Sequence, residues 1–166
     1  SRGLSEETRT AVQEFLSFEK DMLGLAARIT DHKIDVERIR IHGDYHLGQV
    51  LFTGRDFIII DLEGEPARAL SERRLKYSAF RDIAGMVRSF HYAISSRYLE
   101  RTAIRPEDTE ALEPWIAPWY AFVAQTFLGG YLDTVDGAPF VPSNPEDTAL
   151  LLDLFVMEKA VYEIGY

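Results

Sequence analysis

The sequence predicts an α+β fold that is mostly helical and carries one small β-hairpin. Several stretches repeat apolar residues at the three- and four-residue intervals of a helix. Two short runs rich in Val, Ile and Phe, at residues 50–52 and 57–60, flank the turn sequence Thr-Gly-Arg-Asp. Because glycine reaches the positive φ angles of a tight turn, this pattern indicates two antiparallel strands joined by a short loop.

The predicted helices lie on both sides of the hairpin in the sequence. The first begins at Ser5 and keeps its apolar period to about Ile29, and residues 34–41 then lead toward the hairpin. Residues 62–77 are rich in charged and chain-breaking residues, so no regular element is predicted there. The other helices are expected at residues 81–100, 110–133 and 146–166.

Length and composition fit one domain or one lobe of a larger enzyme. The chain has 166 residues, of which 46% are hydrophobic, enough for a substantial core. It has no cysteine, which excludes disulfides, and its net charge of −9 argues against a nucleic-acid surface. No apolar run is long enough to span a membrane and no signal peptide is visible, so we expect a soluble cytoplasmic protein.

Residues 41–51 contain the main chemical motif. They read Ile-His-Gly-Asp-Tyr-His-Leu-Gly-Gln-Val-Leu, and Ile-Ile-Ile-Asp-Leu-Glu follows at residues 58–63. In the kinase template one Asp takes the proton of the acceptor hydroxyl, an amide five residues later holds a metal ion, and a later Asp holds Mg²⁺. Asp44, Gln49 and Asp61 fit these places in that order.

The predicted hairpin explains the spacing of these residues. If the chain reverses at Gly54 and Arg55, antiparallel pairing places Gln49 opposite Ile60 and brings Asp61 close by. The amide and the carboxylate can then hold one ion between phosphates, and such an oxygen-ligand pair suits Mg²⁺. We therefore expect Asp44 to act as the base, Gln49 and Asp61 to bind the metal, and ATP to be the phosphoryl donor.

Two other interpretations of the motif stay open. His-Gly-Asp can form a plain turn, with Asp44 accepting backbone hydrogen bonds and His42 packed in the core. Alternatively, His42, Asp44 and His46 alternate along the chain and could bind one ion as in a metallohydrolase, although no third histidine lies near them. The combination of the amide, the hairpin and the later Asp favours the kinase interpretation.

Parts of the kinase template are absent from the sequence. It contains no Gly-x-Gly-x-x-Gly loop and nothing like the strand lysine that orients nucleotide phosphates. The motif begins at residue 41, which leaves too little preceding chain for a nucleotide-covering β lobe. We therefore expect residues 1–166 to be the C-terminal lobe of a longer kinase without its N-terminal nucleotide lobe, and to be close to inactive alone.

Three segments carry a family resemblance. They read His-Gly-Asp-Tyr-His-Leu-Gly-Gln-Val-Leu at 42–51, Ile-Asp-Leu-Glu-Gly-Glu-Pro-Ala-Arg at 60–68, and Arg-Asp-Ile-Ala-Gly-Met-Val-Arg-Ser-Phe at 81–90. Together they closely resemble the maltokinases, of the aminoglycoside-phosphotransferase-like branch of the kinase fold, including the kinase portion fused behind trehalose synthase in some bacteria. Gln49, where most of that branch carries Asn, together with the Gly-Glu-Pro sequence after Asp61, makes the match specific to maltokinases. The resemblance implies ATP-dependent phosphorylation of maltose at its anomeric hydroxyl, with Mg²⁺, to give maltose 1-phosphate for α-glucan synthesis.

The last predicted helix carries a candidate acceptor site. Lys159, Tyr162 and Tyr166 lie on one helical stripe, and a cation beside two phenol rings suits sugar hydroxyls and pyranose faces. An ordinary helix with packed tyrosines and a solvated lysine is the alternative. In maltokinases the resembling Glu-Lys-Ala-Val-Tyr-Glu segment is associated with sugar binding, which implies a substrate-binding role here.

Several further side chains are weaker candidates. Glu63 is expected to contact the sugar or to be a surface carboxylate, and His46 to brace the loop or touch the acceptor. Asp82 is expected to be a structural acid at the start of its helix. Trp115 and Trp119 could stack on sugar, but a packing role is favoured.

Two rival functions stand beside maltokinase. The first is another small-molecule kinase of the same branch, acting on an aminoglycoside or an amino alcohol. The second is a non-catalytic module that binds sugar or a partner enzyme such as trehalose synthase. ADP release with a panel of acceptors separates the first from maltokinase, and calorimetry with maltose tests the second.

Overall fold

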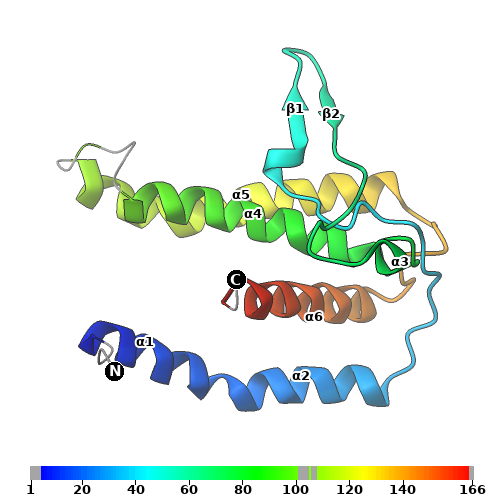
Figure 1. Cartoon of the computed structure of the whole chain (residues 1–166), viewed down its shortest axis with the longest axis horizontal. Coiled ribbons are helices and arrows are strands. Elements are labelled where there is room, and N and C mark those ends of the chain that lie inside the picture. Colours follow the sequence, from blue (N-terminus) through cyan, green and yellow to red (C-terminus); the bar gives the residue numbers. More distant parts are fainter. Residues whose placement is uncertain (1–4, 101–104, 106–107, 165–166) are drawn as a thin grey trace. The chain divides into compact units, whose positions relative to one another are not determined.

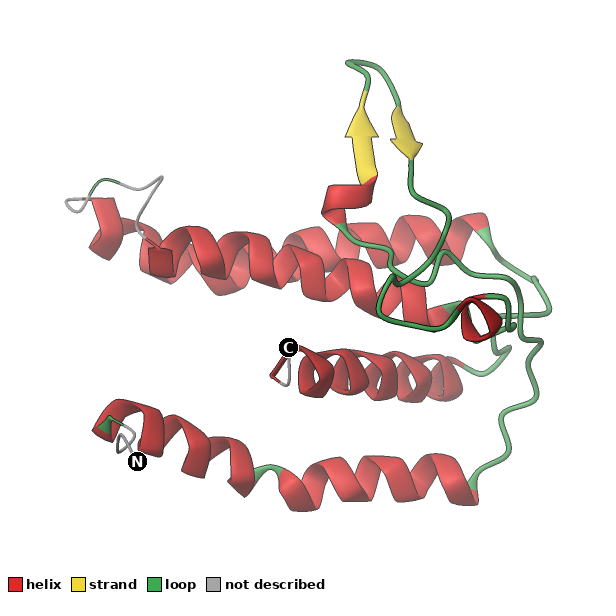
Figure 2. Cartoon of the chain, in the orientation of Figure 1, coloured by secondary structure: helices red, strands yellow, loops and turns green. Residues whose placement is uncertain are grey.

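The computed structural model describes residues 5–100, 105 and 108–164. Contacts divide the chain into two compact units, residues 1–35 and residues 36–166. As the sequence predicts, the described residues form a mostly helical protein with one two-stranded antiparallel sheet (Figure 1, Figure 2).

The first unit contains two helices where the sequence predicts one. α1 spans Glu6–Ser17 and α2 spans Glu19–Asp31, and the helical hydrogen bonding is interrupted at Phe18. There the Ser17 hydroxyl donates to the carbonyl of Glu14 at 2.6 Å, and the Phe18 N–H bonds the carbonyl of Phe15 at 3.1 Å, a tightened turn. A serine hydroxyl that competes for a helix carbonyl is a physical reason for the break.

The second unit is built around α4 (Phe80–Glu100), which packs against both α5 (Thr109–Thr134) and α6 (Pro145–Ile164). These bounds agree closely with the predicted helices. Edge-on contact between the rings of Phe90 and Phe127, 5.5 Å apart, joins α4 to α5. Among the described residues, most of the buried apolar side chains lie at or next to the start of α4, and those buried are Ala79, Phe80, Ile83, Ala84, Met86, Val87, Phe90, Ala124, Leu150 and Leu151. The hydrophobic core of this unit is therefore centred on the first half of α4.

Local signals explain where α6 begins. Pro145 occupies its first position, where the missing N–H of proline costs no helical hydrogen bond. The side chain of Asn144 accepts the backbone N–H of Glu146 at 3.0 Å, which satisfies one of the donors left unpaired at a helix start. Among the described residues, no helix combines the length and the apolar character needed to cross a membrane.

The hairpin has the predicted register. β1 (Val50–Phe52) pairs with β2 (Phe57–Ile59), with Val50 opposite Ile59. A backbone hydrogen bond from Ile60 to Gln49, 3.0 Å long, continues the pairing past the strands, so Gln49 lies opposite Ile60 as expected. Gly54 in the turn has a φ angle of 91°, as the turn prediction requires.

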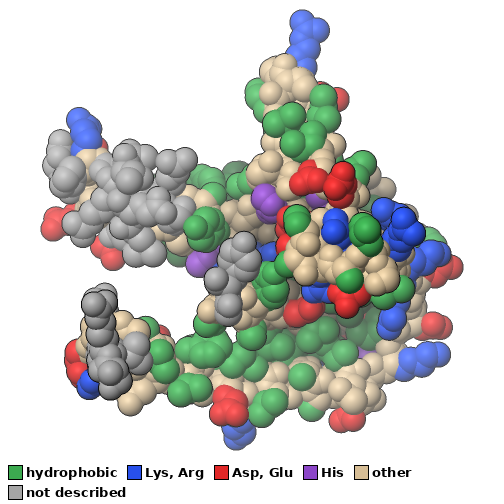
Figure 3. All heavy atoms as spheres, viewed as in Figure 1, with side chains coloured by type: hydrophobic (Ala, Val, Ile, Leu, Met, Phe, Trp, Pro, Cys, Tyr) green, Lys and Arg blue, Asp and Glu red, His purple; other side chains and the backbone are tan. Residues whose placement is uncertain are grey.

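The hairpin projects from the helices of its unit, and hydrophobic side chains are exposed along it (Figure 3). A short 3-10 helix, η1 (Leu47–Gln49), connects the preceding loop to β1. After β2 the chain returns through α3 (Leu70–Arg73), a single turn in the segment that the sequence leaves irregular. An isolated β-bridge between Ile39 and Tyr77 joins the two ends of the segment that contains the hairpin and α3.

Candidate active site

The His-Gly-Asp loop, residues 42–49, is fastened to the first turns of α4. The Asp82 carboxylate accepts the backbone N–H of His42 at 2.6 Å and that of Gly43 at 2.8 Å. Farther along α4, the Ser89 hydroxyl accepts the N–H of Leu47 at 2.9 Å. Positions 82 and 89 lie on the same helical stripe, so one side of α4 holds both ends of the loop.

Two glycines allow the loop to come this close. A Cβ atom on Gly85, which lies between the two anchoring positions of α4, would be 2.6 Å from the backbone oxygen of Tyr45. Gly43 has a φ angle of 86°, a conformation that L side chains rarely adopt. The loop geometry therefore depends on the absence of a side chain at both positions.

The carboxyl of Asp82, which anchors the loop, is partly buried and poorly hydrated. Burial raises the pKa of Asp82, against the opposing effect of the two backbone N–H groups that it accepts. Burial, together with the charge of Asp82, also raises the pKa of Tyr45 and of Tyr131. The sequence predicts Asp82 as a structural acid; its link to the loop, across a separation of 39 and 40 residues, is new information from the structure.

His42 joins the loop to the end of the hairpin. Its Nε2 bonds the carbonyl of Ile60 at 2.8 Å, and its Nδ1 accepts the N–H of Asp44 across a longer 3.4 Å. Both ring nitrogens thus face backbone groups. Among the described residues, no group of three or more His, Asp or Glu side chains is arranged to hold a metal ion. The geometry therefore gives no support to the metallohydrolase interpretation.

Asp44 lies at the front of the loop with its side chain 18% exposed. One carboxylate oxygen is 3.7 Å from Nε2 of His46, and Nδ1 of His46 accepts the N–H of Gly48 at 3.0 Å. His46 is therefore held by the loop itself and lies beside Asp44. Gly48 permits this arrangement, because a Cβ atom there would be 2.7 Å from Cε1 of the His46 ring.

Gln49, which precedes β1, contacts Asp61, which follows β2, at the open end of the hairpin. The amide nitrogen of Gln49 donates to Oδ2 of Asp61 at 3.1 Å. Asp61 has a φ angle of 59°, which is rare for a residue other than glycine and is enriched at functional sites. An amide oxygen and a carboxylate are ligands that suit Mg²⁺, which takes few protein ligands and completes its shell with phosphates and water. Rotation of the Gln49 amide would turn its oxygen toward such an ion.

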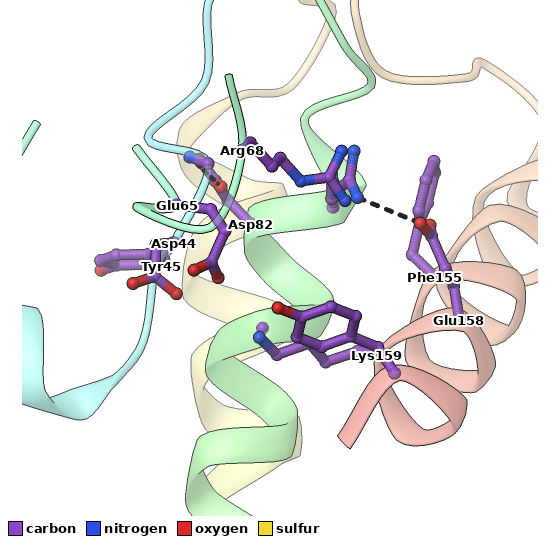
Figure 4. Close-up of a pocket in the computed structure, with 12 residues that line it drawn as sticks. Asp44, Tyr45, Glu65, Arg68, Asp82, Phe155, Glu158 and Lys159 are labelled. Atoms are coloured by element: carbon purple, nitrogen blue, oxygen red, sulfur yellow. Dashed lines mark hydrogen bonds and ion pairs between the residues drawn. The ribbon is translucent and has the colours of Figure 1, made fainter. Parts of the chain in front are cut away.

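Two adjoining cavities lie in front of Asp44. Their volumes are about 50 Å³ and about 510 Å³. Both are bounded by Asp44, Glu65 and Gly85 on one side and by Lys159 and Tyr162 of α6 on the other. In Figure 4 the carboxylates of Asp44 and Glu65 point into the smaller cavity, and Lys159 reaches it from α6.

The structure places the predicted acceptor residues as follows. The Lys159 ammonium lies 5.3 Å from the centre of the Tyr162 ring, so the two side chains share one face of α6. His46 borders the larger cavity. Tyr166 lies outside the described residues. Glu63 is exposed and borders neither of the two cavities.

Glu65 and Arg68 are among the charged cavity residues that the sequence did not indicate as site residues. Both line the smaller cavity, and Glu65 also lines the larger one. Gly64 precedes Glu65 with a φ angle of 81°, which redirects the chain after Glu63. The Gly-Glu-Pro sequence at residues 64–66 carries a turn signal, from which a change of direction at this point could have been expected.

Comparison with known proteins relates this chain to glucosamine kinases. No family model matches the sequence. A glucosamine kinase of Mycolicibacterium smegmatis is 32% identical over 97 residues, which cover 57% of this chain and 22% of that protein. A glucosamine kinase of Streptacidiphilus jiangxiensis is 26% identical over 97 residues, covering 58% of this chain and 20% of that protein.

Solved structures show a similar fold. Glucosamine kinase in complex with glucosamine, ADP and inorganic phosphate has a TM-score of 0.73 at 20% identity, over 93% of this chain and 36% of that one. A second crystal structure of glucosamine kinase has a TM-score of 0.70. The chain is thus homologous to one part of glucosamine kinase, and it spans about a fifth of the length of these curated relatives.

Proposed function

We propose that this chain is the acceptor-binding lobe of an ATP-dependent sugar kinase. One observation carries the proposal: Asp44, held against α4 by its loop, faces the same cavity as Lys159 and Tyr162 of α6. A carboxylate beside a cation and a phenol is what a sugar hydroxyl needs in order to be bound and deprotonated. The relatives supply independent support, because they are kinases of a sugar.

In the proposed mechanism Asp44 orients the acceptor hydroxyl and takes its proton as the phosphoryl group is transferred. Lys159 and Tyr162 hold the sugar, and His46 braces Asp44 from within the loop. Gln49 and Asp61 would hold Mg²⁺, which when bound would neutralise charge on the phosphates of ATP. The rate enhancement then comes mainly from positioning and electrostatics, as is usual for phosphoryl transfer.

For the acceptor we propose maltose, phosphorylated at its anomeric hydroxyl to give maltose 1-phosphate. The support is the Lys159 and Tyr162 stripe, with Tyr166 as its expected third member, and the resemblance described above. Glucosamine is the second candidate, because the relatives are glucosamine kinases and because Asp44 and Glu65 place two carboxylates at the cavity, where they would attract an ammonium group. Glu63, the other carboxylate that the sequence predicts as a sugar contact, borders neither cavity.

The activity is proposed for the full-length protein. The chain covers 36% of the glucosamine kinase that was solved with ADP, so a nucleotide lobe is expected elsewhere in the polypeptide. A fused trehalose synthase is a further proposed partner. A non-catalytic role for this lobe would be supported if the full-length protein bound maltose but released no ADP.

An acceptor panel tests the proposal. Full-length protein is incubated with ATP and Mg²⁺ and with maltose, glucosamine, glucose or an aminoglycoside, and ADP release is measured for each. We expect maltose to give the highest kcat/KM. A higher value for glucosamine would move the acceptor to the second candidate. Absence of ADP release with every sugar would refute the sugar-kinase proposal.

A further inference from the structure

We propose that two ion pairs between α4 and α6 are positioning contacts that hold Lys159 and Tyr162 in front of Asp44. The pairs are Arg81 with Glu158 and Arg88 with Glu163, called here the α4–α6 ion pairs. The inference rests on the proposed function, since it concerns how the acceptor side chains of that site are held.

The helix α4 supports both halves of the site. One stripe of it, at positions 82, 85 and 89, carries the His-Gly-Asp loop and therefore Asp44. Arg81 and Arg88, which are seven residues apart and thus share another stripe, bind α6. The separation between the base and the acceptor side chains is therefore set by a single rigid element, provided that α6 keeps its place on α4.

On α6 the two glutamates bracket the acceptor side chains. Glu158 immediately precedes Lys159, and Glu163 immediately follows Tyr162. Because neighbouring residues on a helix are about 100° apart, a helix whose two glutamates are fixed cannot rotate without breaking an ion pair. The pairs thus fix the direction in which Lys159 and Tyr162 point.

The contacts have good geometry. Nη2 of Arg81 lies 3.0 Å from Oε1 of Glu158. Nε and Nη2 of Arg88 both bind Oε2 of Glu163, at 3.1 and 2.7 Å. The guanidinium of Arg81 also lies 5.0 Å from the centre of the Tyr77 ring, which restricts its orientation. Planar guanidinium groups held in this way define position better than a lysine would.

The fully buried apolar side chains of α6 lie at its other end. The buried apolar residues of α6, Leu150 and Leu151, lie near its beginning. Residues 158–164 are all half-buried or exposed, and Ile164 is 65% exposed. The part of the helix that carries Lys159 and Tyr162 therefore has no fully buried apolar side chain, and the two ion pairs join it to α4.

The test uses the full-length protein with Arg88→Glu, Glu163→Arg and the double exchange of both. For each variant we measure kcat, the KM for the sugar and for ATP, sugar affinity by calorimetry, and the temperature of unfolding. A misplacement of about 1 Å can cost two orders of magnitude in rate, so we expect kcat/KM for the sugar to fall by at least about tenfold in each single variant, with a higher sugar KM because Lys159 and Tyr162 are the proposed sugar contacts. The KM for ATP should stay unchanged, and the double exchange should recover most of the loss.

Arg105→Ala is the matched control. Arg105 forms an ion pair of similar length with Asp108, 2.7 Å, at a position that borders neither cavity in front of Asp44. Its removal should leave the sugar KM unchanged. The inference is overturned if Arg88→Glu keeps the sugar affinity and the sugar KM of the wild type, or if its only effect is a lower unfolding temperature.

The failure of this inference is distinguishable from failure of the proposed function. A wild-type protein that phosphorylates sugar, with variants equal to it, overturns the positioning role and leaves the kinase proposal intact. A wild-type protein that neither binds nor phosphorylates any sugar overturns both.

Discussion

The two sides of the site are built differently. The His-Gly-Asp loop, which carries Asp44, is held to α4 by side chains that accept its backbone N–H groups, and Asp82, which accepts two of them, lies in a poorly hydrated place. Gln49 and Asp61 lie at the base of an exposed two-stranded hairpin, and Asp61 is itself exposed and has a left-handed backbone. The loop that carries Asp44 is thus pre-organised, whereas the Gln49 and Asp61 pair is open to solvent.

This difference fits the roles proposed for the two sides. A base must meet the acceptor hydroxyl within hydrogen-bonding distance, so a pre-organised loop lowers the cost of reaching the reactive geometry. A metal that arrives with a nucleotide has to enter and leave, and an exposed pair of ligands permits this. The predictions that follow test this contrast, beginning with the largest expected effect.

Replacement of Asp44 by Asn removes the proposed base without altering the size of the side chain. We expect kcat of the full-length enzyme to fall by at least about 100-fold, because a lost general base usually costs this much. The unfolding temperature should hardly change. Activity near that of the wild type, measured as ADP release, would refute the role of Asp44.

Replacement of Asp61 by Asn tests the open side. Asn tolerates the observed φ angle of 59°, so the fold should be kept. The loss of a negatively charged ligand should raise the Mg²⁺ concentration needed for half-maximal rate by at least about tenfold, as even outer-shell changes at metal sites do. Asp133→Asn, at an exposed position near the end of α5, is the control and should leave the Mg²⁺ dependence unchanged. Equal Mg²⁺ curves for Asp61→Asn and the wild type would exclude the metal role.

Replacement of Gly85 by Ala probes the fixed side. The new Cβ would lie 2.6 Å from the backbone oxygen of Tyr45, so the loop has to move. We expect the free energy of unfolding to drop by about 1–3 kcal/mol, as for other overpacked sites, and turnover to fall with it. At Gly129 on α5 an added Cβ would meet no atom of another segment within 4 Å, so Gly129→Ala should instead stabilise the protein by about 0.5–1 kcal/mol. Chemical denaturation of both variants measures the difference; a stabilised Gly85→Ala protein would show that the approach is not tight.

The smallest effect concerns pH and an adjacent part of α4. Burial lowers the pKa of His91, whose ring packs edge-on against Tyr120 at 5.2 Å. The unfolded chain therefore binds a proton more readily than the folded one, and stability is lost as the pH falls from the ordinary value of 6.5 toward the lowered pKa. His91→Gln should reduce this loss. Unfolding temperatures of both proteins at pH 7 and pH 5 measure it, and parallel changes would contradict the assignment to His91.

The hairpin and the long helices could be predicted because their signals are local. Gly54 and the flanking apolar runs fix a register that places Gln49 opposite Ile60, within a dozen residues of chain. The bounds of the long helices could be predicted from the spacing of their apolar residues. The start of α6 is also marked by Pro145 and by the Asn144 cap. No glycine or proline marks the break between α1 and α2 at Phe18. The break depends on the Ser17 hydroxyl, whose hydrogen bond cannot be read from the sequence.

The parts of the site that could not be predicted depend on tertiary contacts. An acid in the first turn of a helix is expected to stabilise that helix, so nothing local marks Asp82 as the partner of His42 and Gly43. The choice between Glu63 and Glu65 as the carboxylate at the cavity depends on the left-handed backbone of Gly64. The pairing of Arg81 and Arg88 with α6 depends on which helices become neighbours.

The exposed hairpin has a practical consequence for work with this chain by itself. Its sheet has only two strands, so each strand has an outer edge with unpaired backbone groups, and the rings of Phe52 and Phe57 are 65% and 67% exposed. Such ribbons recruit further strands from other copies unless something covers them. Preparations of residues 1–166 alone should therefore self-associate edge to edge as their concentration rises, and Phe57→Lys should suppress this self-association.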